Sequence, residues 1–128
     1  MVIGLHHVHV ICGDVEKTAQ YFKDIFEAEE VYRGTLGGFP FIRINLKGLT
    51  INLTGTEPGA GMLDAGKGNR GLDHFSLKIK DMESMVQHVQ EKGVKILRGP
   101  GVSDTGNKFV FIEGPDGICL ELMQLKEE

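Results

Sequence analysis

The feature that most constrains this chain is an internal repeat. The segment Leu5–Phe26 (LHHVHVICGDVEKTAQYFKDIF) returns 67 positions later as LDHFSLKIKDMESMVQHVQEKG. This shift places His7 over His74 and Asp14 over Asp81. Each copy alternates as a strand does and then has an aspartate where a helix N-cap belongs, followed by apolar residues at helical spacing. A repeated strand–helix segment predicts two similar modules.

The rest of each copy predicts three further strands. In the first copy they fall within residues 27–55, with breaks at 34–40 and at the Lys47–Gly48 turn. In the second copy we expect a strand at 94–98, a turn-rich loop at 99–107, and a hairpin of 108–112 with 118–124. The sequence therefore predicts a βαβββ module twice, in an α+β chain.

Domain boundaries follow from composition. The stretch 55–71 is rich in glycine and has no periodicity, which is typical of a connection. We therefore predict one domain over residues 1–128, with module one at 1–54, a linker at 55–71 and module two at 72–128.

Charge and cysteine content exclude several classes. The net charge of −4 gives no basic footprint for nucleic acid, and no apolar run has the length of a membrane span. The two cysteines, Cys12 and Cys119, lie in strand-like runs and suit buried, reduced thiols. We expect a cytoplasmic protein without nucleic-acid or membrane partners.

Polar residues at matched positions of the repeat suggest a site. Aligning the last strands of the two copies places Asn52 over Glu121, and alternation directs both away from the helix, as it does His7 and His74. Two imidazoles and a carboxylate suit a divalent transition metal and leave positions open for substrate. The alternative is an ordinary wet sheet face, since a single strand histidine is more often exposed than a ligand.

Two further residues share that predicted face. His9 is a candidate acid or base near neutral pH, and an exposed strand histidine is an equal alternative. Arg43 is a candidate for holding a substrate carboxylate or phosphate, with a salt bridge at the rim as the alternative. His6 and His88 are interpreted as surface residues, and Cys119 as a small apolar side chain.

Three segments, HHVHVICGDVEKTAQYF, RGLDHFSLKIKDMES and GPDGICLELMQ, resemble the glyoxalase/bleomycin resistance/dioxygenase (vicinal oxygen chelate) superfamily. The resemblance implies paired βαβββ modules that form a cupped, mostly antiparallel sheet with the helices outside. It implies a divalent ion (Zn, Ni, Mn or Fe) held by His7, His74 and Glu121. The remaining position, commonly Glu or Gln in glyoxalase I and the acyl-CoA epimerases, is Asn52.

The chain departs from individual branches of that superfamily. Ile11 and Thr56 stand where glyoxalase I has its glutathione-binding Arg and Asn. Arg70, four residues before His74, matches an arginine that the family directs toward the substrate. Phe111 replaces a tyrosine of the extradiol dioxygenases, which favours lyase or isomerase chemistry over dioxygenation.

These expectations describe a metal-dependent enzyme acting on a small oxygen-chelating molecule. Glu121 or His9 would move the proton, and Arg70, Arg43 and Asn52 would contact the substrate. The alternatives are an extradiol-type dioxygenase and a metal-free antibiotic-binding module, for which 7% aromatics without Trp is a poor composition. A lone module leaves a sheet edge and one face uncovered, so we expect a homodimer.

Overall fold

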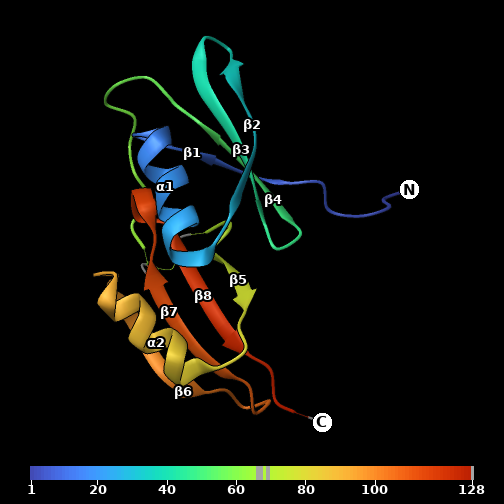
Figure 1. Ribbon diagram of the computed structural model, residues 1–128, viewed down its shortest axis with the longest axis vertical. Coiled ribbons are helices and arrows are strands. Elements are labelled where there is room, and N and C mark those ends of the chain that lie inside the picture. Colours follow the sequence, from blue (N-terminus) through green and yellow to red (C-terminus); the bar gives the residue numbers. More distant parts are fainter. Residues whose placement is uncertain (66–67, 69, 128) are drawn as a thin grey trace. The chain divides into compact units, whose positions relative to one another are not determined.

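The chain forms two compact units, Met1–Gly61 and Met62–Glu128, in a computed structural model. The structure describes residues 1–65, 68 and 70–127. The predicted linker at 55–71 includes residues 66, 67 and 69, which lie outside the described residues. The described residues of each unit form one α-helix and one four-stranded sheet, and Figure 1 shows these elements along the chain.

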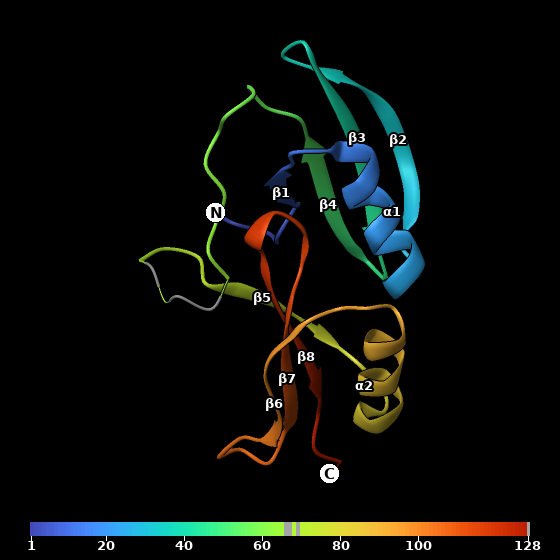
Figure 2. The same cartoon turned by 90° about the vertical axis from the view of Figure 1, so that its left-hand side faces the viewer.

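The first unit has the order βαβββ. Its elements are β1 (Val8–Ile11), α1 (Val15–Phe26), β2 (Glu29–Leu36), β3 (Phe39–Leu46) and β4 (Leu49–Thr54). The strands lie in the order β1-β4-β3-β2, with β1 parallel to β4 and the other pairs antiparallel. Helix α1 packs on β3 and β4 (Figure 2).

The second unit repeats this plan. Its elements are β5 (His74–Lys78), α2 (Met82–Glu91), β6 (Ile96–Val102), β7 (Lys108–Glu113), a short 3₁₀ turn (Pro115–Gly117) and β8 (Cys119–Gln124). The strand order β5-β8-β7-β6 matches that of the first unit, again with one parallel pair. The predicted α+β class and the duplicated βαβββ module are therefore confirmed. Neither helix in the described part of the chain is long and apolar enough to cross a membrane.

Both helices begin where the repeat places an aspartate. The Asp14 side chain accepts a hydrogen bond from the backbone N–H of Lys17 at 3.1 Å, and Asp81 accepts one from Ser84 at 3.0 Å. These bonds satisfy N–H groups that have no partner within the first helical turn. At the other end of α2, Gly93 has φ +76°, a conformation that favours glycine. The predicted caps are confirmed.

Alternation along the inner strands forms the core of each unit. Ile51 and Leu53 in β4 are fully buried, as are Leu120 and Leu122 in β8. These residues occupy the sheet face that the helix covers. The polar residues between them, among them Asn52 and Glu121, therefore lie on the opposite face, which is the face predicted for the site.

Two strand boundaries differ from the sequence prediction. The break between β2 and β3 is only Gly37–Gly38, since both glycines adopt positive φ and close a two-residue turn. Gly34 and Pro40, expected outside the strands, pair within them. Strand β6 continues through residues 99–102, where a loop was predicted, because two irregularities in its register absorb the extra residues.

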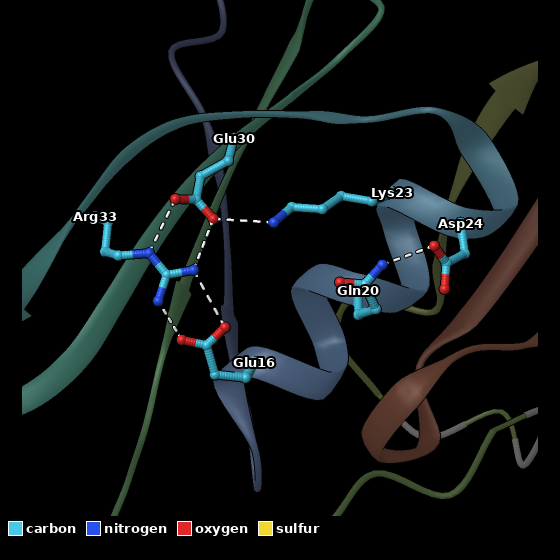
Figure 3. A network of polar contacts seen from close by, with 6 residues as sticks. All are labelled: Glu16, Gln20, Lys23, Asp24, Glu30 and Arg33. Carbon is cyan, nitrogen blue, oxygen red and sulfur yellow. Dashed lines mark hydrogen bonds and ion pairs between the residues drawn. The ribbon is translucent and has the colours of Figure 1, made fainter.

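A network of charged side chains joins α1 to the edge strand β2 (Figure 3). Arg33 on β2 binds both Glu16 on α1 and Glu30, and Lys23 of α1 reaches Glu30 at 3.0 Å. Hydrogen bonds from Arg33 and then Lys23 lower the pKa of Glu30 to about 2, and Arg33 also lowers the pKa of Glu16. The carboxylates are thus held in their charged form to low pH.

This network predicts an acid dependence of stability. The folded state favours ionised Glu30, so its contribution is complete above its ordinary pKa of 4.5 and is lost as pH falls toward about 2. In Arg33→Gln, the midpoint of thermal unfolding should therefore fall less steeply between about pH 6 and pH 3. High salt should shrink the difference, because these side chains are partly exposed.

Lys47→Gln is the matched control, because Lys47 makes one exposed pair with Glu27 at 3.6 Å. It should keep the acid dependence of the wild type. If the unfolding midpoint falls equally steeply with pH in the wild type and in Arg33→Gln, the network does not contribute to the acid dependence of stability.

Candidate functional site

The sheet face opposite each helix has one row of side chains in register across all four strands. Directly paired residues point to the same face of a sheet. In the first unit the row is Tyr32, Arg43, Asn52 and His9. In the second it is Arg98, Phe111, Glu121 and Ser76. Asn52 and Glu121 thus occupy matched positions in the two units.

The second unit brings together a histidine and a buried carboxylate. His74 Nε2 lies 3.6 Å from Glu121 Oε1, and the Glu121 side chain is only 11% exposed. On the other side of the ring, His74 Nδ1 lies 2.7 Å from Asp73 Oδ2. A carboxylate only accepts, so Nδ1 donates to Asp73, and the lone pair of a neutral ring is then on Nε2.

The chemistry of this pair fits a divalent ion. Two atoms bound to one ion at about 2.1 Å, with roughly 90–110° between them, lie about 3.0–3.4 Å apart. The 3.6 Å between His74 Nε2 and Glu121 Oε1 is close to that range. Burial, together with the charges of Asp73 and Glu121, raises the pKa of the Cys119 thiol. The two carboxylates of Asp73 and Glu121 lie near the pair, and their negative charge would favour a cation there.

His7 has a similar neighbour in the first unit. It lies directly before β1, and its Nδ1 is 2.8 Å from Nδ1 of His6. In the repeat, His6 matches Asp73, so the residue before each predicted ligand contacts the Nδ1 of that ligand. The sequence analysis missed Asp73 and treated His6 only as a surface residue. The sequence feature that could have indicated these contacts is the polar residue directly before each predicted histidine ligand, in the dipeptides His6-His7 and Asp73-His74.

Asn52 is bound differently from Glu121. Its Oδ1 accepts a hydrogen bond from Arg43 Nε at 2.8 Å. The atom with which Asn52 would ligate a cation is therefore engaged by a guanidinium, whose charge repels a metal ion. The predicted substrate-binding residues Arg43 and Asn52 thus lie in contact, and Asn52 is a poor fourth ligand.

The two remaining predicted residues, His9 and Arg70, differ in their surroundings. His9 Nε2 lies 2.7 Å from the buried Thr54 hydroxyl, which holds the ring in place. Arg70 is exposed and makes no hydrogen bond or ion pair with a residue that the structure describes. Within the described part of either unit, three or more potential metal ligands do not gather. Of the predicted ligands, His7 belongs to the first unit, and His74 and Glu121 belong to the second.

Comparison with known proteins shows the family. The model described as Glyoxalase/Bleomycin resistance protein/Dioxygenase superfamily matches residues 4–122. A lactoylglutathione lyase of Arabidopsis thaliana is 30% identical over 92% of this chain, which spans only 43% of that protein. A probable lactoylglutathione lyase of Synechocystis is 28% identical, with 94% of both chains covered.

Solved structures share the fold. A glyoxylase/bleomycin resistance protein/dioxygenase domain from Frankia superposes with a TM-score of 0.82 at 21% identity, covering 98% of this chain and all of that one. The fosfomycin resistance protein FosX from Listeria monocytogenes, complexed with Mn(II) and sulfate, gives 0.76 at 20% identity, covering 98% of this chain and 95% of that one. With its duplicated βαβββ fold and the match over nearly its whole length, this chain belongs to the glyoxalase/bleomycin resistance protein/dioxygenase superfamily.

Proposed function

We propose that this protein is a divalent-metal-dependent enzyme that acts on a small oxygen-chelating substrate by lyase or isomerase chemistry. The observation that carries the proposal is the His74–Glu121 pair with Asp73 behind the imidazole. Relatives named lactoylglutathione lyase support it, as does a methylmalonyl-CoA epimerase of Bos taurus at 26% identity.

His7, His74 and Glu121 would hold the ion. When bound, a divalent ion supplies Lewis acidity to two oxygens of the substrate. Imidazole and carboxylate ligands are compatible with Zn, Ni, Mn or Fe. The Mn(II) in the FosX structure supports a divalent ion without selecting one for this chain.

Proton transfer is assigned to Glu121 and His9. Glu121 is nearly buried and lies 3.6 Å from His74 Nε2, so its carboxylate is held beside the position proposed for the ion and could accept a proton from a substrate bound there. The hydrogen bond to Thr54 orients the His9 ring, so that its other nitrogen is available for a proton. Arg43 and Asn52 would contact the substrate from the row that contains His9.

Phe111 supports lyase or isomerase chemistry over dioxygenation. Its ring meets His74 edge to face, with 5.0 Å between ring centroids, and it offers no hydroxyl for acid–base work. A tyrosine at this position would have provided one.

A metal-free binding module is the second candidate. Tyr32, Phe41, Phe109 and Phe111 share the site faces of the two sheets, in register with Arg43, Thr54, Met123 and Glu121 respectively. The chain is poor in aromatics, but these four rings lie on the faces where a small molecule would bind. Metal analysis separates the two candidates.

The first prediction concerns metal content. Protein purified without chelator or an affinity histidine tag should contain about one divalent ion per chain, measured by inductively coupled plasma mass spectrometry. His74→Ala should lose most of it, since one of three predicted ligands is removed. His88→Ala on α2 is the matched control and should retain the ion. Full metal retention in His74→Ala would exclude the proposed ligand set.

The second prediction concerns Asp73. Asp73→Asn keeps the size of the side chain but removes the charge that orients His74, so metal affinity should fall about 10–100-fold. Competition with a chromophoric chelator measures the affinity without requiring turnover. Asp104→Asn, an exposed loop change of the same charge, should leave affinity unaltered. If the metal affinity of Asp73→Asn equals that of the wild type, the contact between Asp73 and His74 does not contribute to metal binding.

The third prediction concerns assembly. We propose a homodimer in which modules of two chains complete each site. Each sheet has two edges, and the edge strand β2 exposes Val31, Tyr32 and Leu36. Sedimentation at micromolar concentration should give about twice the chain mass of 14.1 kDa. A single species at the mass of one chain would contradict it.

The proposed compartment rests on the thiols alone. Cys12 and Cys119 are both buried, one in each unit, which suits a reducing environment. A cytoplasmic location stays a prediction.

A further inference from the structure

Arg43 is a partly buried cation that has no carboxylate partner among the residues the structure describes. Arg33, in the same unit and more exposed, binds two carboxylates. Removing a charge from water is unfavourable unless an opposite charge or hydrogen bonds compensate. The environment of Arg43 is therefore suited to an anion from outside the unit.

The Arg43 guanidinium is held in one orientation. Its Nε donates to Asn52 Oδ1, and its Cζ lies 5.4 Å from the ring centroid of Phe41 and 6.0 Å from that of Tyr32. The two Nη groups donate to no side chain within the described part of the chain. They present the paired N–H groups with which arginine binds a carboxylate or phosphate.

Asn52 suits this arrangement because its amide is neutral. A carboxylate at this position would form an ion pair with Arg43 and cancel its charge. At the matched position of the second unit, Glu121 is paired in register with Phe111 and not with a cation. At these matched positions, the central strand pair thus has one charged residue in each unit: Arg43 beside Asn52 in the first and Glu121 beside Phe111 in the second.

We infer that Arg43 and Asn52 form an oxyanion subsite, so that the substrate has a carboxylate or phosphate group in addition to its chelating oxygens. That the bound anion is part of a substrate rests on the proposed function, whereas the anion site itself does not. Neutral chelating molecules should therefore be poorer ligands than anionic ones of similar size.

The test is calorimetric titration of the full-length protein as purified, with inorganic phosphate in one arm and malonate in the other. Wild-type protein should bind at least one of them saturably, and the arm that binds identifies the anion. Arg43→Gln should weaken that binding by roughly tenfold or more, because a charge-assisted pair of hydrogen bonds is lost.

Arg33→Gln is the matched control, since it removes the same charge from the same unit at an arginine already paired with two carboxylates. Its anion binding should equal that of the wild type. Asn52→Asp is a second variant of nearly identical shape, in which the new carboxylate should neutralise Arg43 and give the same loss. This variant keeps the test decisive if Arg43→Gln fails to fold.

Absence of binding in the wild type, or binding unaltered in both Arg43→Gln and Asn52→Asp, would overturn the inference. Metal content measured on the same samples separates this result from the proposed function. Anion binding that depends on Arg43 in metal-free protein would support the subsite and oppose the metal enzyme. Protein that contains the metal but does not bind the anion through Arg43 would support the metal enzyme and oppose the subsite.

Discussion

Burial of alternate residues in β4 and β8 beneath a helix is the constraint on which the rest of each unit depends. Ile51, Leu53, Leu120 and Leu122 are inaccessible to solvent, so these strands cannot shift by one residue without exposing them. The same register sends every intervening side chain to the opposite face. The positions of Asn52 and Glu121 are therefore a consequence of core packing. The same strands that form the core also hold the polar residues of the candidate site.

Equal positions in the two units have acquired unequal roles through their neighbours. Glu121 is paired in register with Phe111 and lies 3.6 Å from His74, so its carboxylate is available to a cation. Asn52 is paired with Arg43 and accepts a hydrogen bond from it. In the proposed site, the residue on the adjacent strand, aromatic in one unit and cationic in the other, would decide whether the central position favours a metal or an anion.

Much of the fold follows from the sequence because its signals are local. Asp14 and Asp81 cap helices by bonds that span three residues, and alternation identifies the strands. The β2–β3 turn and the bulged strand β6 were misplaced because pairing with a neighbouring strand outweighs the local preference of Gly34, Pro40 and residues 99–102 for turns. The local preferences of these residues carry no information about the strand with which they pair.

The sheet positions of the candidate site residues could be predicted from the sequence, but their side-chain contacts could not. The repeat identifies which residues match, whereas the bonds of Asp73 to His74 and of Arg43 to Asn52 depend on side-chain conformation. The ion-pair network at Arg33 was not predicted for the same reason, since it joins residues 17 positions apart on different elements. Side-chain contacts across elements require the register and the turns to be known first.

The neutral side chain at Asn52 has a consequence for the chemistry of the proposed site. With a carboxylate there, a bound ion would receive more negative charge, and Arg43 would be neutralised at the same time. With asparagine, a bound ion would keep more of its Lewis acidity, and the guanidinium would keep its full charge. Both effects would favour an anionic, oxygen-rich ligand over a neutral one, since position 52 adds no carboxylate that would compete with that ligand for the ion or for Arg43. In the proposed site, three protein ligands on the ion and a fully charged Arg43 would therefore both follow from the asparagine at position 52.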